Sequence, residues 1–206
     1  MKKFTPVGVQ ELRPGLHVKQ PQVIDAALPY IKNRKTVIQA GGHLGGWPWK
    51  LAQEFKQVVS FEPVPENWIV ANNSTPHENV IILMGVLGNK TGVLAVSDIT
   101  SKHFSGSQTV TEVGPRIPTP VYVIDQLPTF MTQGCGAMFL DVEGFELEIL
   151  KGAVETLKRD KPVLILEENA QGARHNLNPG DLEKWLKPFG YEKVDTFDRD
   201  IILVAK

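Results

Sequence analysis

A glycine-rich turn and an acid that follows it are the residues of this chain best suited to bind a ligand. Residues 41–45 read Gly-Gly-His-Leu-Gly after an apolar stretch, and Glu62 ends the next apolar stretch. Glycines in such a turn let the backbone approach a ligand where a Cβ atom would collide. A carboxylate after the second strand can accept hydrogen bonds from a ribose, at nearly the spacing of about 20 residues found in nucleotide-binding βαβ units. The pair therefore predicts an adenosine-containing cofactor.

The turn and the acid each have a simpler explanation. The turn could join a strand to a helix without binding anything, and its spacing from Ala40 to Gly45 also nearly fits the dinucleotide fingerprint. Glu62 could cap the following helix, although glutamate is a poor N-cap residue. An acid directly after an apolar strand, followed by Pro63, instead lies at the carboxyl edge of a sheet, where open α/β sheets bind ligands. This placement favours a binding site.

A second group of acids follows two later apolar stretches. Asp141 and Glu143 come after residues 136–140, and Glu167-Glu168-Asn169 comes after residues 162–166. A carboxylate at such a strand end can accept a proton from a hydroxyl, directly or through a metal that lowers the hydroxyl pKa. The same acids could instead cap the next helix, where negative charge suits the positive end of the helix dipole. Both interpretations stay open for Asp141 and Glu143.

Alternating strands and helices must position these residues. Apolar and β-branched runs predict strands at 36–40, 57–61, 79–84, 91–97, 120–127, 136–140, 162–166, 190–194 and 201–204. Apolar residues at helical spacing predict helices at 23–32, 47–55, 65–73 and 146–158, and a last helix capped by Asn178 with Pro179 as its first residue. The final two strands are joined so tightly that they must pair antiparallel. The pattern predicts a mostly parallel α/β sheet with one reversed strand near the C-terminus.

The segment 98–119 is too long for an ordinary connection in a compact domain, and long segments of this kind often form lids or binding loops. We expect it to contribute to the site for a second substrate. Two histidines and two arginines in this segment and after residue 168 are further candidates for a base or an anion contact: His103, Arg116, Arg174 and His175.

Size and charge narrow the classes of function. The chain has 206 residues and a formal net charge of −1, which suits one domain and gives no electrostatic footprint for nucleic acid. The single cysteine, Cys135, excludes an internal disulfide. No apolar run reaches the roughly 18 residues needed to span a bilayer, and the N-terminus has no signal-peptide core. We expect a cytoplasmic protein without a membrane segment; nothing in the sequence indicates its oligomeric state.

Five short motifs resemble those of the FkbM-type methyltransferases. They are Phe61-Glu62-Pro63, Glu66-Asn67, Asn79-Val80, Asp141-Val142-Glu143-Gly144-Phe145-Glu146 and Leu150-Lys151-Gly152-Ala153. The Asp-x-Glu-Gly-x-Glu element with its Leu-Lys-Gly-Ala sequel is the most specific part. The resemblance spans about residues 36–170 and includes the strand ends that carry the acids.

The resemblance implies a Rossmann-like class I methyltransferase fold, with a seven-stranded, mostly parallel sheet, a reversed C-terminal strand and helices on both faces. It implies a single methyltransferase domain over residues 1–206, in which residues 1–35 form a lead-in with a short helix. S-adenosylmethionine is the implied cofactor, with these residues around it: Gln39, Gly41, Gly42, His43, Gly45, Glu62, Gly85 and Val86. The catalytic candidates are Asp141, Glu143 and Glu168, and the expected reaction is O-methylation of a hydroxyl on a small molecule or glycan.

A metal is a further expectation from resemblance. Asp141, Glu168 and Asn169 resemble the magnesium ligands of catechol-type O-methyltransferases, with a glutamate in place of one aspartate. Three oxygen ligands on adjacent strand ends suit a hard cation. A polar strand end that simply meets water is the alternative to a Mg²⁺ cofactor.

The chain departs from the family pattern in its first loop, which usually reads Asp-x-Gly-Ala-Asn-x-Gly. Gln39 stands for the acid, Gly42 for the alanine and His43 for the asparagine, and Phe139 stands where a lysine is common. The loss of the acid removes a negative charge but leaves hydrogen-bonding groups. These departures keep two alternatives open: a non-catalytic binding module of the same fold and, less favoured, an NAD-dependent oxidoreductase.

Overall fold

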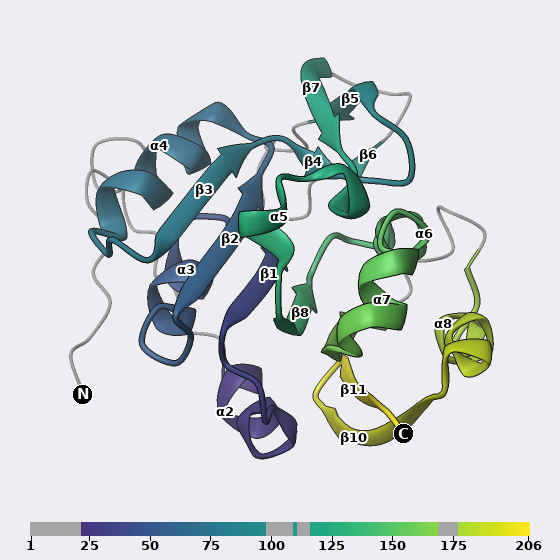
Figure 1. The fold of residues 1–206 in the computed structure, drawn as a ribbon. Helices are drawn as coiled ribbons and strands as arrows, with labels where there is room; N and C mark the ends of the chain where they lie inside the picture. Colours follow the sequence, from purple (N-terminus) through teal and green to yellow (C-terminus); the bar gives the residue numbers. More distant parts are fainter. Residues whose placement is uncertain (1–21, 98–108, 111–115, 169–176) are drawn as a thin grey trace.

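A central sheet of seven strands organises the computed structural model, which describes residues 22–97, 109–110, 116–168 and 177–206 (Figure 1). The strand order is β10-β11-β9-β8-β1-β2-β3. The strands are β1 (Thr36–Ala40), β2 (Gln57–Glu62), β3 (Val80–Met84), β8 (Cys135–Leu140), β9 (Val163–Glu167), β10 (Tyr191–Phe197) and β11 (Asp200–Ala205). From β3 to β9 neighbours pair parallel, whereas β11 runs antiparallel to both β9 and β10. The predicted sheet with a reversed C-terminal strand is confirmed.

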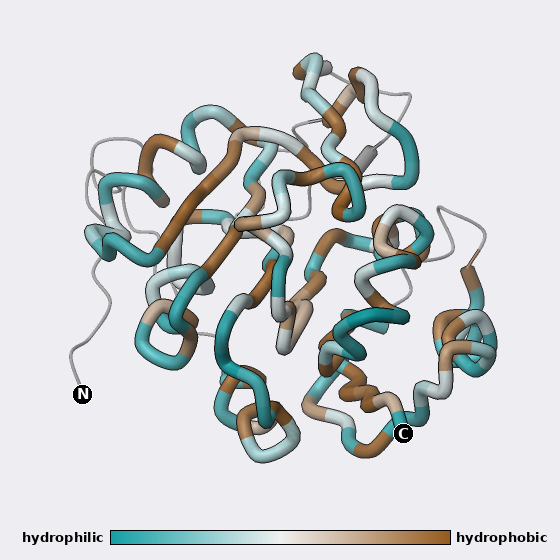
Figure 2. Tube along the Cα trace, viewed as in Figure 1, coloured by the Kyte–Doolittle hydropathy of each residue, from teal (hydrophilic) through white to brown (hydrophobic). Residues whose placement is uncertain are grey.

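Helices cover both faces of this sheet because its central strands are apolar on both sides. The helices are α2 (Val23–Ala27), η1 (Leu28–Tyr30), α3 (Gly46–Leu51), α4 (Pro65–Ser74), η2 (Ile124–Gln126), α5 (Thr129–Thr132), α6 (Glu146–Lys151), α7 (Val154–Asp160), α8 (Asp181–Leu186) and η4 (Lys187–Phe189). Successive side chains alternate between faces: Val37 packs in the core with α2 and α3, and Ile38 packs in the core with α6, α7 and α8. Figure 2 shows hydrophobic stretches along the central strands.

A second, four-stranded sheet, which the sequence did not indicate, lies beside the central one (Figure 1). Its strands are β4 (Val86–Leu87), β5 (Gly92–Ser97), β6 (Thr109–Val110) and β7 (Arg116–Tyr122), in the order β4-β7-β5-β6. The strand expected at 120–127 therefore begins at residue 116 and ends at residue 122. Pro118 and Pro120 mark a loop in sequence, yet here they pair opposite Ala95 and Val93, where β4 does not extend alongside them.

The single helix expected over 146–158 is two helices, α6 and α7. Gly152 approaches the chain at Gly88 so closely that a Cβ atom there would lie 2.1 Å from the Gly88 carbonyl oxygen. The new helix then begins against Asp125, whose carboxylate accepts hydrogen bonds from the backbone N–H groups of Glu155 (2.8 Å) and Thr156 (2.9 Å). The break thus follows from contacts with distant parts of the chain.

The last helix also begins later than expected. It starts at Asp181, after Gly180 in a left-handed conformation (φ +86°), so Pro179 is not its first residue. The Asp181 carboxylate accepts a hydrogen bond of 2.9 Å from the backbone N–H of Asn178, and no side-chain hydrogen bond caps the helix at Gly180.

Glu146, the last acid of the Asp-x-Glu-Gly-x-Glu element, shapes the loop between β8 and α6. Glu143 (φ +58°) and Gly144 (φ +102°) are both left-handed, which reverses the chain sharply after the strand. Oε1 of Glu146 accepts hydrogen bonds of 3.3 Å from the backbone N–H groups of Val142 and Gly144. The side chain is 1% exposed, and this burial raises the pKa of its carboxyl from 4.5 to about 7. Glu146 therefore holds the loop at the cost of a buried acid.

Because the pKa of Glu146 is higher in the folded protein, folding favours its protonated form. The stability that this group contributes is fully present below about pH 4.5 and is lost as the pH rises through about 7. We predict that Glu146→Gln, which keeps an oxygen acceptor, flattens the pH dependence of the unfolding free energy over this window by up to roughly 3 kcal/mol. Urea unfolding between pH 4.5 and 8 measures it, with Glu155→Gln on the exposed side of α7 as the control. Parallel curves for wild type and Glu146→Gln would contradict the prediction.

Candidate functional site

The candidate site lies where β1, β2, β8 and β9 end, at the carboxyl edge of the central sheet. The glycine turn follows β1, Glu62 is the last residue of β2, and Asp141 follows β8. Because these strands are parallel neighbours, their carboxyl ends meet at the same edge. The structure therefore brings together the two groups of residues that the sequence singled out.

The glycines of the turn are required by close contacts. Gly41 has φ +86°, and a Cβ atom on it would lie 2.1 Å from the carbonyl oxygen of Asp141. Gly45 has φ +96°, and a Cβ atom on it would lie 2.9 Å from Cα of Ala71 in α4. The backbone N–H groups of Gly41 and Gly42 both donate hydrogen bonds of 3.0 Å to the carbonyl oxygen of Phe61. The turn is thereby fixed between β2, β8 and α4.

Glu62 is held against this turn. Its carboxylate is 2% exposed and accepts a 2.7 Å hydrogen bond at Oε2 from the backbone N–H of His43. Oε1 accepts hydrogen bonds from the backbone N–H of Val64 (3.0 Å) and from Nδ2 of Asn67 (3.2 Å). The network orients the acid and links it directly to the glycine turn.

Gln39 occupies the position of the family acid and is fully buried. Its Oε1 accepts a 2.5 Å hydrogen bond from Oγ of Ser60, which is its partner in the β1–β2 register, and its Nε2 donates a 2.9 Å bond to the carbonyl oxygen of Ala40. Sequence reasoning did not single out Ser60. Its position opposite Gln39 in the strand register is the signal that identifies it.

The other expected cofactor residues follow β3. The backbone N–H of Gly85 donates a 3.1 Å hydrogen bond to the carbonyl oxygen of Glu62. A Cβ atom on Gly85 would lie 2.5 Å from the ring of Tyr122, so this position also needs glycine. Val86 begins β4 and is half-buried. These residues therefore adjoin the end of β2, next to Glu62.

Three acids at this edge form a compact group, which we call the acidic triad: Asp141, Glu143 and Glu167. One carboxylate oxygen of each lies within 4.8 Å of the others. Burial raises the pKa of Asp141 well above its usual range, and the negative charge of Glu167 raises it further. The triad thus crowds three acids together beside the glycine turn.

Glu167 rather than Glu168 joins Asp141. Glu167 is the last residue of β9, whereas the Glu168 carboxylate accepts a 2.7 Å hydrogen bond from the backbone N–H of Gly180, before α8. Successive residues of an extended chain point to opposite sides, so a shift of one residue decides which acid faces the site. Asn169, His103, Arg174 and His175 lie outside the described residues, as does the side chain of Arg116. Alternation along 163–167 is the signal that could have found Glu167.

Phe139, at the position of the common family lysine, lies opposite Gln39 in the β1–β8 register. Its side chain is fully buried in the core beside α2 and α3, and its ring centroid lies 5.8 Å from that of Trp47. The substitution therefore serves packing at that position.

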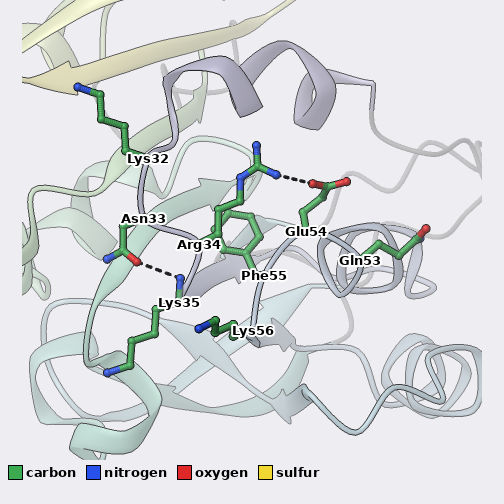
Figure 3. A pocket seen from close by; sticks show the side chains of 8 residues that line it. All are labelled: Lys32, Asn33, Arg34, Lys35, Gln53, Glu54, Phe55 and Lys56. Atoms are coloured by element: carbon green, nitrogen blue, oxygen red, sulfur yellow. Dashed lines mark hydrogen bonds and ion pairs between the residues drawn. The ribbon is translucent and has the colours of Figure 1, made fainter.

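A cavity of about 450 Å³ lies at the opposite edge of the sheet, where β1 and β2 begin (Figure 3). Its lining includes four cations, Lys32, Arg34, Lys35 and Lys56, and Arg34 is paired to Glu54 at 2.7 Å. Three of these cations lie within residues 32–35, a local group that was overlooked in the sequence, and the fold brings Lys56 to them. None of the residues expected to bind a cofactor or to act in catalysis lines this cavity.

Solved structures of methyltransferases share the fold. A methyltransferase FkbM from Methylobacillus flagellatus KT is 17% identical with a TM-score of 0.54, covering 82% of this chain and 43% of that one. An S-adenosylmethionine-dependent methyltransferase from Aquifex aeolicus is 16% identical with a TM-score of 0.52, covering 99% and 100%. The magnesium protoporphyrin IX methyltransferase of Synechocystis PCC 6803, solved with bound S-adenosylmethionine, is 13% identical with a TM-score of 0.51, covering 90% and 79%. The chain thus spans less than half the length of the FkbM structure.

Other comparisons bear on the chain as a whole. Within the described residues, every helix is too short or too polar to cross a bilayer. A comparison with curated proteins finds no match. The family model of the methyltransferase FkbM domain matches residues 40–193, well over half of the sequence. Together with the class I methyltransferase topology of the central sheet, this match shows that the chain belongs to the FkbM family of S-adenosylmethionine-dependent methyltransferases.

Proposed function

We propose that this protein transfers the methyl group of S-adenosylmethionine to a hydroxyl oxygen of a small molecule or glycan. One observation supports the proposal most strongly. The glycine turn with Glu62 and the acids after β8 and β9 lie together at the carboxyl edge of the central sheet. The glycine turn and Glu62 are joined by the bond from His43 N–H, and the turn contacts Asp141 through Gly41. A cofactor held at the first group would place its reactive end near the second.

Glu62 is the residue that we assign to the cofactor ribose. It is a carboxylate at the end of β2, oriented by three hydrogen bonds and adjacent to Gly85. In open α/β folds this strand end is where an acid binds the ribose hydroxyls. Gly41, Gly42, His43 and Gly45 would then border the rest of the cofactor.

Asp141 is the residue that we assign to the acceptor. Methyl transfer is an in-line displacement: the hydroxyl oxygen forms a bond to the methyl carbon, the carbon–sulfur bond breaks, and its electron pair remains on sulfur. The hydroxyl proton passes to the carboxylate of Asp141, which acts as general base. Alignment of the two reactants and exclusion of water supply much of the acceleration. Glu143, on the same loop, borders this position and Glu168 lies at the next strand end.

Gln39 and Phe139 keep open the alternative of a non-catalytic binding module. A measurement of cofactor binding tests whether the protein binds S-adenosylmethionine at all. We expect calorimetric titration to show micromolar binding of S-adenosylmethionine and S-adenosylhomocysteine, and none of NAD. Binding of NAD alone would favour an oxidoreductase. Absence of binding to all three would favour the module.

Glu62→Gln is predicted to weaken S-adenosylhomocysteine binding by about 5- to 150-fold, the equivalent of roughly 1–3 kcal/mol for lost charge-assisted hydrogen bonds. Calorimetry measures the change, and Glu54→Gln at the far edge of the sheet is a control with the same loss of charge.

Since Glu62 is also structural, a ligand lacking the ribose hydroxyls gives a second test of the same assignment. Wild type should prefer S-adenosylhomocysteine over its 2′,3′-dideoxy analogue, and Glu62→Gln should lose most of that preference. An equal preference in both proteins would remove Glu62 from the ribose site.

Asp141→Asn is predicted to lower methyl transfer by about 10²- to 10⁴-fold, the usual contribution of a general base. Cofactor binding should change little, because the contact with the turn is made by the Asp141 backbone. Transfer of a labelled methyl group to a panel of hydroxyl-bearing glycans and small molecules measures the rate, with Asp25→Asn at an exposed ion pair as the control. Undiminished transfer by Asp141→Asn would exclude it as the base.

A further inference from the structure

The acidic triad places three carboxylates where their charges oppose one another. Asp141 and Glu143 come from the loop after β8 and Glu167 from the end of β9, and one oxygen of each lies within 4.8 Å of the others. When all three are ionised, none of them can donate a hydrogen bond to another. A positive charge among the three carboxylates would relieve this repulsion.

The Oε2 atom of Glu167 is a poorly compensated acceptor in this group. Its side chain is only 10% exposed, and its Oε2 is buried and accepts no hydrogen bond from the residues that the structure describes. Arg199 lies on the other oxygen, Oε1, but at 3.7 Å its Nη1 is beyond hydrogen-bond distance, and its side chain is 64% exposed. A solvated arginine at this distance compensates little of a buried charge. Among the residues that the structure describes, Oε2 is thus an acceptor without a donor.

The spacing of the triad fits a cation that prefers oxygen. Mg²⁺ binds oxygen at about 2.0–2.1 Å, so opposite ligands of one ion lie about 4 Å apart, and Ca²⁺ binds at about 2.3–2.6 Å, so opposite ligands lie about 5 Å apart. The triad oxygens, all within 4.8 Å of one another, fall in this range with small adjustments of side chains. Carboxylates are the ligands that these hard cations select.

We propose that the acidic triad binds one divalent cation that prefers oxygen ligands, such as Mg²⁺ or Ca²⁺, through Asp141, Glu143 and Glu167. The ligand set differs from the one expected from sequence, which used Glu168 and Asn169. For its role the inference rests on the proposed function: a cation here would hold the acceptor hydroxyl beside the cofactor and lower the pKa of that hydroxyl.

Calorimetric titration of MgCl₂, MnCl₂ and CaCl₂ into the chelator-treated full chain, without cofactor, tests the site. We expect one equivalent of cation to bind, and the melting temperature to rise with cation concentration, since a ligand of the folded state stabilises it. Heat of dilution alone and an unchanged melting temperature for all three salts would overturn the proposal.

The variant Glu167→Gln distinguishes a cation site from ordinary packing, because the direction of its change in melting temperature differs between the two. Without cation the variant should melt at a higher temperature than wild type, because one of three opposing charges is gone. With Mg²⁺ it should bind at least tenfold more weakly and lose most of the cation-induced shift. Glu183→Gln in α8, which removes an ion pair with Lys193 of β10, is the control and should respond to Mg²⁺ like wild type. An unaltered Mg²⁺ shift in Glu167→Gln would contradict the assignment.

Cofactor binding measured in EDTA keeps the two proposals apart. Binding of S-adenosylmethionine without any cation binding would overturn the cation site and leave the proposed function intact. Cation binding at the triad without cofactor binding would overturn the proposed function and leave the cation site intact.

Discussion

The contact between Gly41 and the carbonyl oxygen of Asp141 determines how the candidate site is assembled. β1 and β8 are neighbours in register, with Ala40 opposite Leu140, so the glycine turn and the acid emerge side by side. They pack so closely that a Cβ atom at position 41 would lie 2.1 Å from that oxygen, and φ of +86° also favours glycine there. With Glu62 bonded to the same turn through His43 N–H, Glu62 and the acidic triad are tied to one edge of the sheet. This arrangement suits a reaction whose rate depends on alignment.

Glu167 raises the pKa values of three other acids at this edge. The pKa of Asp141 is raised well above its usual range, that of Glu146 to about 7 and that of Asp200 to about 6. Burial is the largest cause in each case, and the negative charge of Glu167 contributes to all three. Each of these acids is therefore harder to ionise in the folded protein than in the unfolded chain. Concentrations of shifted acids in one place are typical of functional sites rather than of packing alone.

Sequence reasoning succeeded where local pattern decides structure and failed where distant contacts decide it. The glycine turn and Glu62 could be paired in advance, because two apolar strands flank a helix at the expected spacing. The choice between Glu167 and Glu168 depends on where β9 ends, to within one residue. The break at Gly152 depends on its contact with Gly88, which no local pattern contains. The second sheet was missed for a related reason: Pro118 and Pro120 indicate a loop unless the pairing with β5 is known.

The departure at Gln39 changes the charge of the site more than its shape. The side chain is fully buried and both ends of its amide are hydrogen-bonded, to Ser60 and to the carbonyl oxygen of Ala40. The turn that follows is held by contacts independent of that amide, namely the bonds to Phe61 and Glu62 and the packing on Ala71. A carboxylate at position 39 would add a further buried negative charge to an edge that already gathers the acidic triad, Glu62 and Glu146. A neutral amide avoids that desolvation cost and still satisfies Ser60. The substitution is thus compatible with an intact glycine turn. If the protein is a non-catalytic binding module, the reason at this position is the lost charge and not a collapsed turn.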